Sequence, residues 1–186
     1  MQAHWHTEDC LWAQALAEQL LNLFEDKQNG GFFFTTHDHE QLLHRPKPLA
    51  DESTASGNAI AVRVLLRLGY LLGEKRYLDA AERTLKYARS AIEKFPLAHT
   101  SLSMALDDYL QPPEIVIIRG DVEVLADWQQ QAFATDRLVF AIPGQAENLP
   151  EALAAKKSQA KTVAYICKGF ECSPPITELE QLQKSR

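Results

Sequence analysis

The spacing of apolar residues changes abruptly at residues 111–113 (Gln-Pro-Pro), and this change constrains the fold of the 186-residue chain more than any other feature. Before it, apolar residues recur every three or four positions, which is the spacing of helices that bury one face. After it come short β-branched runs, of which residues 114–118 are the clearest, and such runs are typical of buried strands. The sequence therefore predicts a helical domain, residues 1–111, and a small α/β domain, residues 112–186.

Four helices are expected in the first of these domains, at about residues 8–28, 56–72, 76–95 and 98–110. The second helix is apolar nearly all round, so it should be buried on more than one side. For the α/β domain the patterns predict the following elements: strands at 114–118, 137–142 and 162–167, helices at 121–133 and 177–184, and a loop with a short helix at 143–160. Strands that alternate with helices at this spacing favour a small parallel or mixed sheet.

The composition excludes several classes of protein. With 46% hydrophobic and 24% charged residues, the chain has the balance of a soluble globular protein. Its net charge of −6 argues against nucleic acid or an anionic membrane surface as the main partner. We expect no membrane span, because no apolar run is long enough. Three cysteines and a start unlike a signal peptide indicate a reducing cytoplasm.

The segment 30–58 concentrates glycines, prolines, charges and small polar residues between two helices, where binding sites are often built. Its candidate ligand-binding residues are Phe33, Arg45, Lys47, Asp51, Ser56 and Asn58. The polar members could bind a sugar or a similar polyol, while aromatic rings provide an apolar platform. The alternative is structural: Asp51 pairs with Arg45, and Ser56 caps the next helix. The sequence leaves both interpretations open.

Several short motifs occur in a fixed order across nearly the whole chain. They are Gly30-Gly31-Phe32-Phe33, Arg45-Pro46-Lys47, Asp51, Ser56-Gly57-Asn58, Pro113-Glu114-Ile115-Val116-Ile117 with Gly120, and Tyr165-Ile166-Cys167, Cys172 and Pro174-Pro175-Ile176-Thr177. With these motifs the sequence resembles the C-terminal portion of the YyaL-like, spermatogenesis-associated thioredoxin-like proteins. The resemblance implies a mainly α fold: part of an α/α toroid of helical hairpins, of the six-hairpin-glycosidase type, followed by a small α/β unit. The thioredoxin-like domain of that family lies outside the matched portion.

Other groups of reactive residues are weaker candidates. The acidic doublets are Asp51-Glu52 and Asp107-Asp108, and the closely spaced histidines are His4 with His6 and His37 with His39. Neighbouring carboxylates on a helix point about 100° apart, so neither doublet forms a glycosidase pair. Two imidazoles are too few for a metal site. We therefore expect no metal and no cofactor.

Cys167 and Cys172 are weak redox candidates at the end of the third predicted strand. A redox site favours a spacing of two residues and a helix N-terminus, whereas four residues separate these cysteines and prolines follow them. In a reducing compartment, reduced structural thiols are favoured over a reversible disulfide.

Two classes of function remain. The first is a non-catalytic or ligand-binding module of a YyaL-like protein. The second, implied by the toroid resemblance, is a carbohydrate-active enzyme, either a sugar epimerase or a glycoside hydrolase. The enzyme requires a concave pocket in which Arg45, Asp51 and Asn58 converge near His37 or His44, whereas the module fits if they satisfy one another in a closed loop.

The expected partners follow from the same reasoning. A sugar-like small molecule is the candidate ligand, and nucleic acids and membranes are not expected. The few predicted hairpins cannot cover both sides of the apolar helix at 56–72, so the chain should form a homo-oligomer or dock onto the missing half of the toroid.

Overall fold

The computed structural model describes residues 2, 4–40, 44–134, 137–158 and 161–184. Contacts divide the chain into two compact units. The sheet unit comprises Met1–Ala13, Leu71–Gly73 and Pro112–Arg186, and the helical unit comprises Gln14–Tyr70 and Glu74–Gln111. The predicted domains 1–111 and 112–186 stay predictions.

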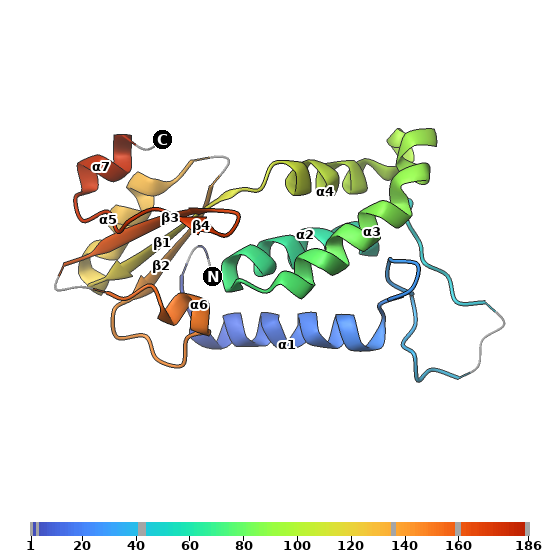
Figure 1. The fold of residues 1–186 in the computed structure, drawn as a ribbon, viewed down its shortest axis with the longest axis horizontal. Coiled ribbons are helices and arrows are strands. Elements are labelled where there is room, and N and C mark those ends of the chain that lie inside the picture. The colour runs from blue at the N-terminus through green and yellow to red at the C-terminus, as the bar shows by residue number, and fades with distance from the viewer. Residues whose placement is uncertain (1, 3, 41–43, 135–136, 159–160, 185–186) are drawn as a thin grey trace. The chain divides into compact units, whose positions relative to one another are not determined.

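Helices account for most of the regular structure before residue 111 (Figure 1). They are α1 (Thr7–Leu23), α2 (Gly57–Leu72), α3 (Lys75–Lys94), the 3-10 helix η1 (Pro96–His99) and α4 (Thr100–Leu110). The helices predicted at 56–72, 76–95 and 98–110 are thereby confirmed to within two residues, apart from the 3-10 turn that opens the last one.

Helix α1 ends at Leu23, five residues before the predicted end at residue 28. The carboxylate of Asp26 accepts the backbone N–H groups of Gln28 and Asn29, at 3.1 and 3.0 Å. This Asx turn satisfies backbone donors locally and so competes with further helix. Gly30 follows with a φ of +82°, and a Cβ there would lie 2.3 Å from the carbonyl oxygen of Arg83, so only glycine fits.

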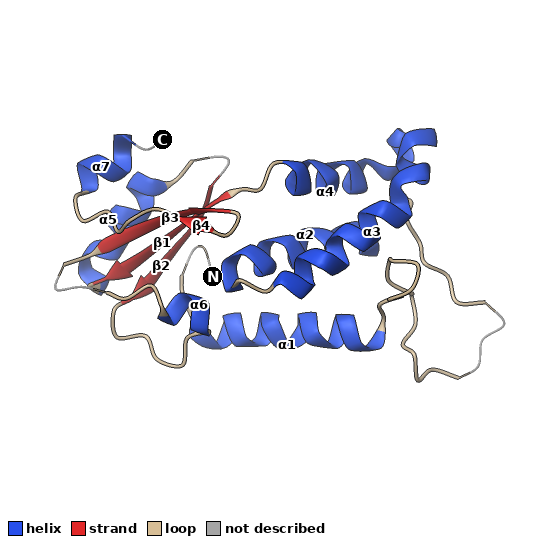
Figure 2. Ribbon diagram, in the orientation of Figure 1, coloured by secondary structure: helices blue, strands red, loops and turns tan. Residues whose placement is uncertain are grey.

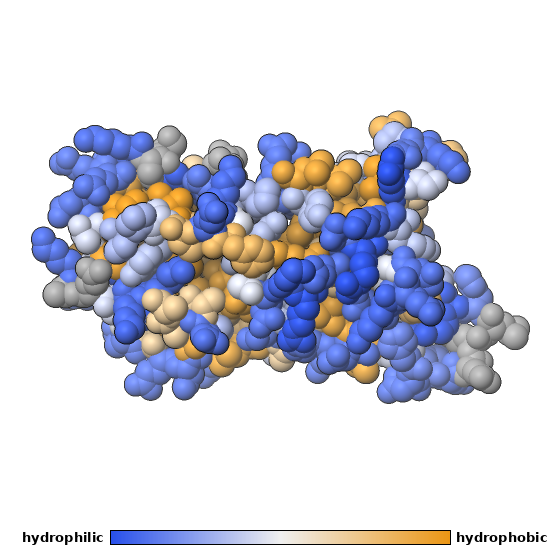
Figure 3. Space-filling view, in the orientation of Figure 1, coloured by the Kyte–Doolittle hydropathy of each residue, from blue (hydrophilic) through white to orange (hydrophobic). Residues whose placement is uncertain are grey.

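Helix α2 is the most apolar helix and is largely buried, as its pattern predicted. Its buried apolar residues are Ala59, Ala61, Val62, Leu65, Leu66, Leu68, Leu71 and Leu72. Ile60 and Val64 remain 46% and 43% exposed. Apolar side chains are also visible over α4 in Figure 3, and Met104 and Leu110 of that helix are exposed. No helix among the described residues has both the length and the apolar character needed to cross a bilayer.

The sheet unit contains a mixed four-stranded sheet (Figure 2). The strands β1 (Glu114–Gly120), β2 (Arg137–Pro143), β3 (Val163–Lys168) and β4 (Glu171–Cys172) lie in the order β2-β1-β3-β4. Strand β1 pairs in parallel with β2, where Val116 lies opposite Val139, and antiparallel with β3, where Ile117 lies opposite Tyr165. The sequence left a parallel or a mixed sheet open, and the structure shows the mixed one.

Helices α5 (Val122–Ala132) and α7 (Leu179–Lys184) pack against the sheet, while the short α6 (Glu151–Ala154) follows the loop after β2. Their shared core consists of Val116, Ile118, Val139 and Ala164 from the strands, and Leu125, Trp128, Ala132 and Leu182 from the helices. Asp121 caps α5 by accepting the N–H of Glu123. The sheet unit thus buries an apolar core of its own.

Arg119 is a buried cation within β1 and is only 4% exposed. Its guanidinium donates to the carbonyl oxygens of Leu153 and Lys156 on one side, and of Pro143 and Gly144 on the other. Burial lowers the pKa of this arginine from its ordinary value. Arg119 therefore links the backbone at the end of β2 to the backbone at the end of α6.

The expected mainly α fold, a partial α/α toroid, is wrong. Helices make up 51% of the described residues, and a four-stranded mixed sheet accompanies them. Toroid hairpins join consecutive antiparallel helices by short loops. Here α1 and α2 are separated by residues 24–56, whose described part contains no helix. The α/β unit that was expected after the helices is present.

Candidate functional site

The predicted site lies in the segment between α1 and α2, and Asn58 in the first turn of α2 is at its centre. The side chain of Asn58 is 2% exposed. Its Oδ1 accepts the N–H of Phe32 at 2.7 Å, and its Nδ2 donates to the carbonyl oxygens of Phe32 and Pro48 at 3.0 and 2.9 Å. Both amide hydrogens are used, so Asn58 holds two parts of the segment against the start of the helix.

Asp51 joins the same segment to the start of α4. Its Oδ1 accepts the N–H of Ser56 at 2.9 Å, and its Oδ2 accepts the N–H of Ser101 at 2.8 Å. Its own N–H donates to the carbonyl oxygen of Ala98 at 2.8 Å. Burial would raise the pKa of Asp51, but the hydrogen bonds from Ser101 and Ser56 outweigh it and hold the pKa below its ordinary value.

Ser56 does not cap α2 with its side chain. Its hydroxyl donates to the carbonyl oxygen of Pro48 at 3.3 Å instead. Among the described residues the alternative pairing of Asp51 with Arg45 is also absent, because Arg45 is directed at Thr35 and His37 instead. The two contacts that the structural alternative named are therefore not the ones these residues form.

Lys47 forms a second cluster with Asp26, Tyr87 and Phe33. Its Nζ donates to Asp26 Oδ2 at 2.8 Å and to the carbonyl oxygen of Gly30 at 2.9 Å. The same ammonium lies 3.8 Å from the ring centroid of Tyr87 and 5.3 Å from that of Phe33, distances typical of cation–π contacts.

The Lys47–Asp26 ion pair is well shielded from water. The two side chains are 9% and 11% exposed. Burial would raise the pKa of Asp26, but the hydrogen bonds from Lys47 and Asn29 outweigh it and hold the pKa far below its ordinary value. The Asp26 carboxylate therefore stays ionised at neutral pH.

Arg45 stacks on Phe33, with its Cζ atom 4.1 Å from the ring centroid. Its Nη2 donates to the carbonyl oxygen of Thr35 at 2.7 Å, and its Nη1 lies 3.2 Å from His37 Nδ1. Arginine cannot accept a hydrogen bond, so His37 Nδ1 is the acceptor and the ring proton resides on Nε2. This tautomer donates to the carbonyl oxygen of Glu25, 3.1 Å away.

The structure thus gathers the six candidates into two groups. Phe33, Arg45 and Lys47 meet in one, and Asp51, Ser56 and Asn58 meet in the other. His37 joins the first group, and His44 is exposed. The polar atoms of these residues are directed at backbone groups and charges of the same segment, apart from the contact of Asp51 with Ser101 of α4. Ligand binding by these residues stays a prediction.

Two residues that hold Lys47 escaped the sequence analysis. The turn formed by Asp26 could have been predicted from the sequence, because an aspartate followed by Asn29-Gly30 is typical of an Asx turn. Tyr87 carried none, since it lies outside the apolar stripe of its helix and is 38% exposed. Its contact with Lys47 depends on tertiary structure.

The redox candidates lie in the sheet unit, where Cys167 and Cys172 form a disulfide. The expectation of reduced thiols at these positions is wrong for this structure, because β3 and β4 place the two residues directly opposite each other. Cys167 is buried and Cys172 is exposed. Cys10 is free and buried, and its burial raises the pKa of the thiol.

Comparison with known proteins finds relatives for nearly the whole chain, although no family model matches it. Spermatogenesis-associated protein 20 of Homo sapiens is 25% identical over an alignment of 184 residues that covers 93% of this chain and 23% of that protein. The protein of the same name from Rattus norvegicus is 24% identical over the same shares. An uncharacterised protein of Caenorhabditis elegans is 25% identical over 83% of this chain and 22% of its own length.

These matches establish homology to spermatogenesis-associated protein 20 and support that part of the family resemblance. The chain spans less than a quarter of the length of the curated relatives it matches.

Proposed function

We propose that this chain acts as a non-catalytic module equivalent to one part of a longer protein similar to spermatogenesis-associated protein 20. Its homology covers nearly all of the chain but under a quarter of each relative. In this proposal the described residues of the segment 24–58 serve as a brace, which holds the first turn of α2 and the start of α4 in place.

The observation that supports this proposal best is the use of both oxygens of Asp51. Each accepts a backbone N–H from the chain itself, one from Ser56 and one from Ser101. A general base must direct an oxygen at its substrate, and a general acid must hold a proton near neutral pH. Each oxygen of Asp51 already accepts one backbone N–H, and a pKa below the ordinary value keeps the carboxyl deprotonated near neutral pH, so Asp51 does not meet the requirement for a general acid.

The same argument applies to the cations of the segment. Lys47 is held by Asp26 and Gly30 between two aromatic rings, and Arg45 is held by Thr35 and His37. A ligand would have to displace these contacts, and the resulting loss would offset much of its binding energy. We do not propose the alternative of a carbohydrate-active enzyme, because it depended on the toroid, which the fold contradicts.

The proposal is tested by a ligand screen with matched variants. The intact chain is melted with and without neutral sugars and sugar phosphates, and each mixture is assayed for hydrolysed or epimerised sugar. We expect no saturable rise in Tm and no product. The variant Asp51→Asn should lower Tm by the same amount with and without sugar.

A different result would overturn the proposal. A saturable rise in Tm that Asp51→Asn or Lys47→Met abolishes would identify a carbohydrate site in this segment. Glu52→Gln serves as the matched control. It removes the charge of the neighbouring carboxylate, which is exposed.

A further inference from the structure

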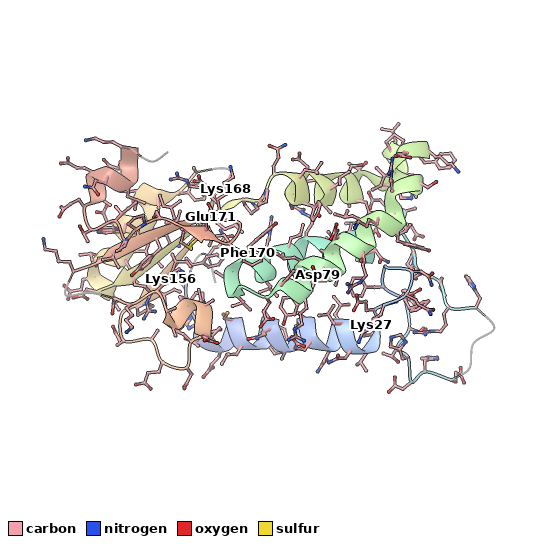
Figure 4. All side chains as sticks on the ribbon, viewed as in Figure 1. Lys27, Asp79, Lys156, Lys168, Phe170 and Glu171 are labelled. Carbon is pink, nitrogen blue, oxygen red and sulfur yellow. A yellow bond between two sulfur atoms is a disulfide. The ribbon has the colours of Figure 1, made fainter. Side chains whose placement is uncertain are left out.

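The hairpin of β3 and β4 carries a disulfide that the proposed function does not use. Cys167 and Cys172 are paired in register on the two strands, and Lys168 lies opposite Glu171 beside them. Gly169, with a φ of +61°, makes the tight turn at the tip. Figure 4 labels the side chains of Lys168, Phe170 and Glu171 around this turn.

We propose that this disulfide is a thiol–disulfide exchange site, which accepts two electrons from a dithiol of another molecule. This inference goes beyond the proposed module function and is independent of it.

The unequal exposure of the two cysteines sets the direction of attack. Cys172 is exposed, whereas Cys167 is 6% exposed. An incoming thiolate reaches the exposed sulfur and forms a mixed disulfide with Cys172 Sγ, while the bond to Cys167 breaks and Cys167 leaves as a thiolate that takes up a proton. The second thiol of the donor then attacks its own sulfur in the mixed disulfide. The donor leaves oxidised, and Cys172 is released as a thiol.

The hairpin has contacts that should persist without the disulfide. The N–H of Ser173 donates to the carbonyl oxygen of Ile166 at 2.8 Å, and the N–H of Ile166 donates to Ser173 Oγ at 3.1 Å. Strand β3 is also paired along β1. These bonds keep the two thiols opposite each other after reduction, so the disulfide can form again within the same molecule.

The loop that the disulfide closes is short, since its cysteines are five positions apart in the sequence. The stabilisation that a disulfide provides by restricting the unfolded chain is smallest for short loops. The bond therefore contributes less to the fold than a disulfide that closes a longer loop would.

The tip of the hairpin also offers a surface beside the exposed sulfur. Phe170 is 61% exposed, and Lys168 and Glu171 on either side of it are exposed as well. An apolar ring flanked by opposite charges can contact a donor molecule, and the ammonium of Lys168 favours the approach of an anionic thiolate.

The proposal is tested first on the intact oxidised chain under native conditions. The chain is incubated in buffers of reduced and oxidised dithiothreitol, free thiols are alkylated, and the labelled cysteines are identified by mass spectrometry. We expect Cys167 and Cys172 to be reduced within minutes, with unchanged circular dichroism and with Cys10 unlabelled. Reduction only after unfolding, or loss of the fold on reduction, would contradict the proposal.

The second test locates the attacked sulfur. Limiting reduced glutathione should leave a mixed disulfide on Cys172 in the intact chain. In addition, Cys167→Ser should react with oxidised glutathione at least about tenfold faster than Cys172→Ser, because only the former retains an exposed thiol. An adduct on Cys167, or equal rates, would overturn the assignment. The position of the glutathione adduct on the intact chain identifies the attacked sulfur even if one of the variants fails to fold.

Discussion

Asn58 binds both backbone polar groups of Phe32, accepting its N–H at 2.7 Å and donating to its carbonyl oxygen at 3.0 Å. The two residues are 26 positions apart, so this pair closes the segment between α1 and α2 onto the first turn of α2. Phe32 is itself 4% exposed. Phe32 also forms an isolated antiparallel β-bridge with Glu25, and the amide of Asn58 satisfies the backbone N–H and C=O of Phe32 itself.

Removing this amide should destabilise the chain strongly. Asn58→Ala leaves the N–H of Phe32 without its buried acceptor, and deprives the carbonyl oxygens of Phe32 and Pro48 of their donors. We expect a loss of about 2–4 kcal/mol in the free energy of unfolding, measured with urea. The exposed Asn22→Ala on α1 is the control and should change it by less than about 0.5 kcal/mol. A comparable effect of both substitutions would contradict the role of Asn58.

The stabilising effect of Asp51 should depend on pH. Its pKa is lower in the folded chain than its ordinary value of 3.8, so its contribution is present above that value and is lost as pH falls through the lower, folded pKa. Asp51→Asn lacks this titration. The difference in unfolding free energy between the intact chain and Asp51→Asn should therefore be constant near neutral pH and shrink below about pH 4. Urea unfolding from pH 7 to pH 3 measures it, and a constant difference throughout would contradict the assignment.

The ion pair of Lys47 and Asp26 should show measurable coupling. The two side chains are shielded from water, so losing one partner leaves an unpaired, nearly buried charge. We expect Lys47→Met and Asp26→Asn each to lower the unfolding free energy, with a coupling energy of at least about 1 kcal/mol in the double-mutant cycle. The exposed pair Lys75 and Asp79 is the control, with an expected coupling below about 0.5 kcal/mol. Equal coupling in both cycles would show that burial does not strengthen the Lys47 pair.

Most helices and strands could be predicted from the sequence, because their apolar residues recur at the spacing of a helix or a strand. Helix α3 and strand β1 are examples, since a single face or a continuous apolar run decides their burial. The end of α1 was predicted five residues too late. The Asx turn that ends it is formed by the polar side chain of Asp26, and the spacing of apolar residues carries no information about such a turn. Strand β4, with two residues, was too short to give a pattern.

The sequence located the candidate site, but it did not predict the hydrogen-bond partners of the residues in that site. The sequence marked Arg45, Asp51 and Asn58 by composition, yet hydrogen bonds over 26 and 50 positions decide what Asn58 and Asp51 do. The toroid prediction failed for a related reason. A resemblance in short motifs fixes local conformation at glycines and prolines, but it does not determine how many helices pack together.

The exposed apolar face of α2 and α4 leads to a prediction about association. Arg63 of α2 and Asp108 of α4 form an ion pair with a distance of 2.7 Å, which places the two helices side by side within the helical unit. Ile60 lies one turn before Arg63, Val64 lies one turn after Ile60, and Met104 lies one turn before Asp108. These three apolar residues are 46%, 43% and 51% exposed. Burying this face against a second copy would remove apolar surface from water.

We expect the chain to form a dimer or larger oligomer at micromolar concentration, as measured by sedimentation velocity. Val64→Glu and Met104→Glu should each shift it toward the monomer, because a carboxylate in an apolar interface loses its hydration without gaining a partner. Leu97→Glu is the matched control, since Leu97 is 92% exposed on η1 and lies outside this face. A monomeric intact chain would exclude self-association, and equal effects of all three substitutions would assign the association to another surface.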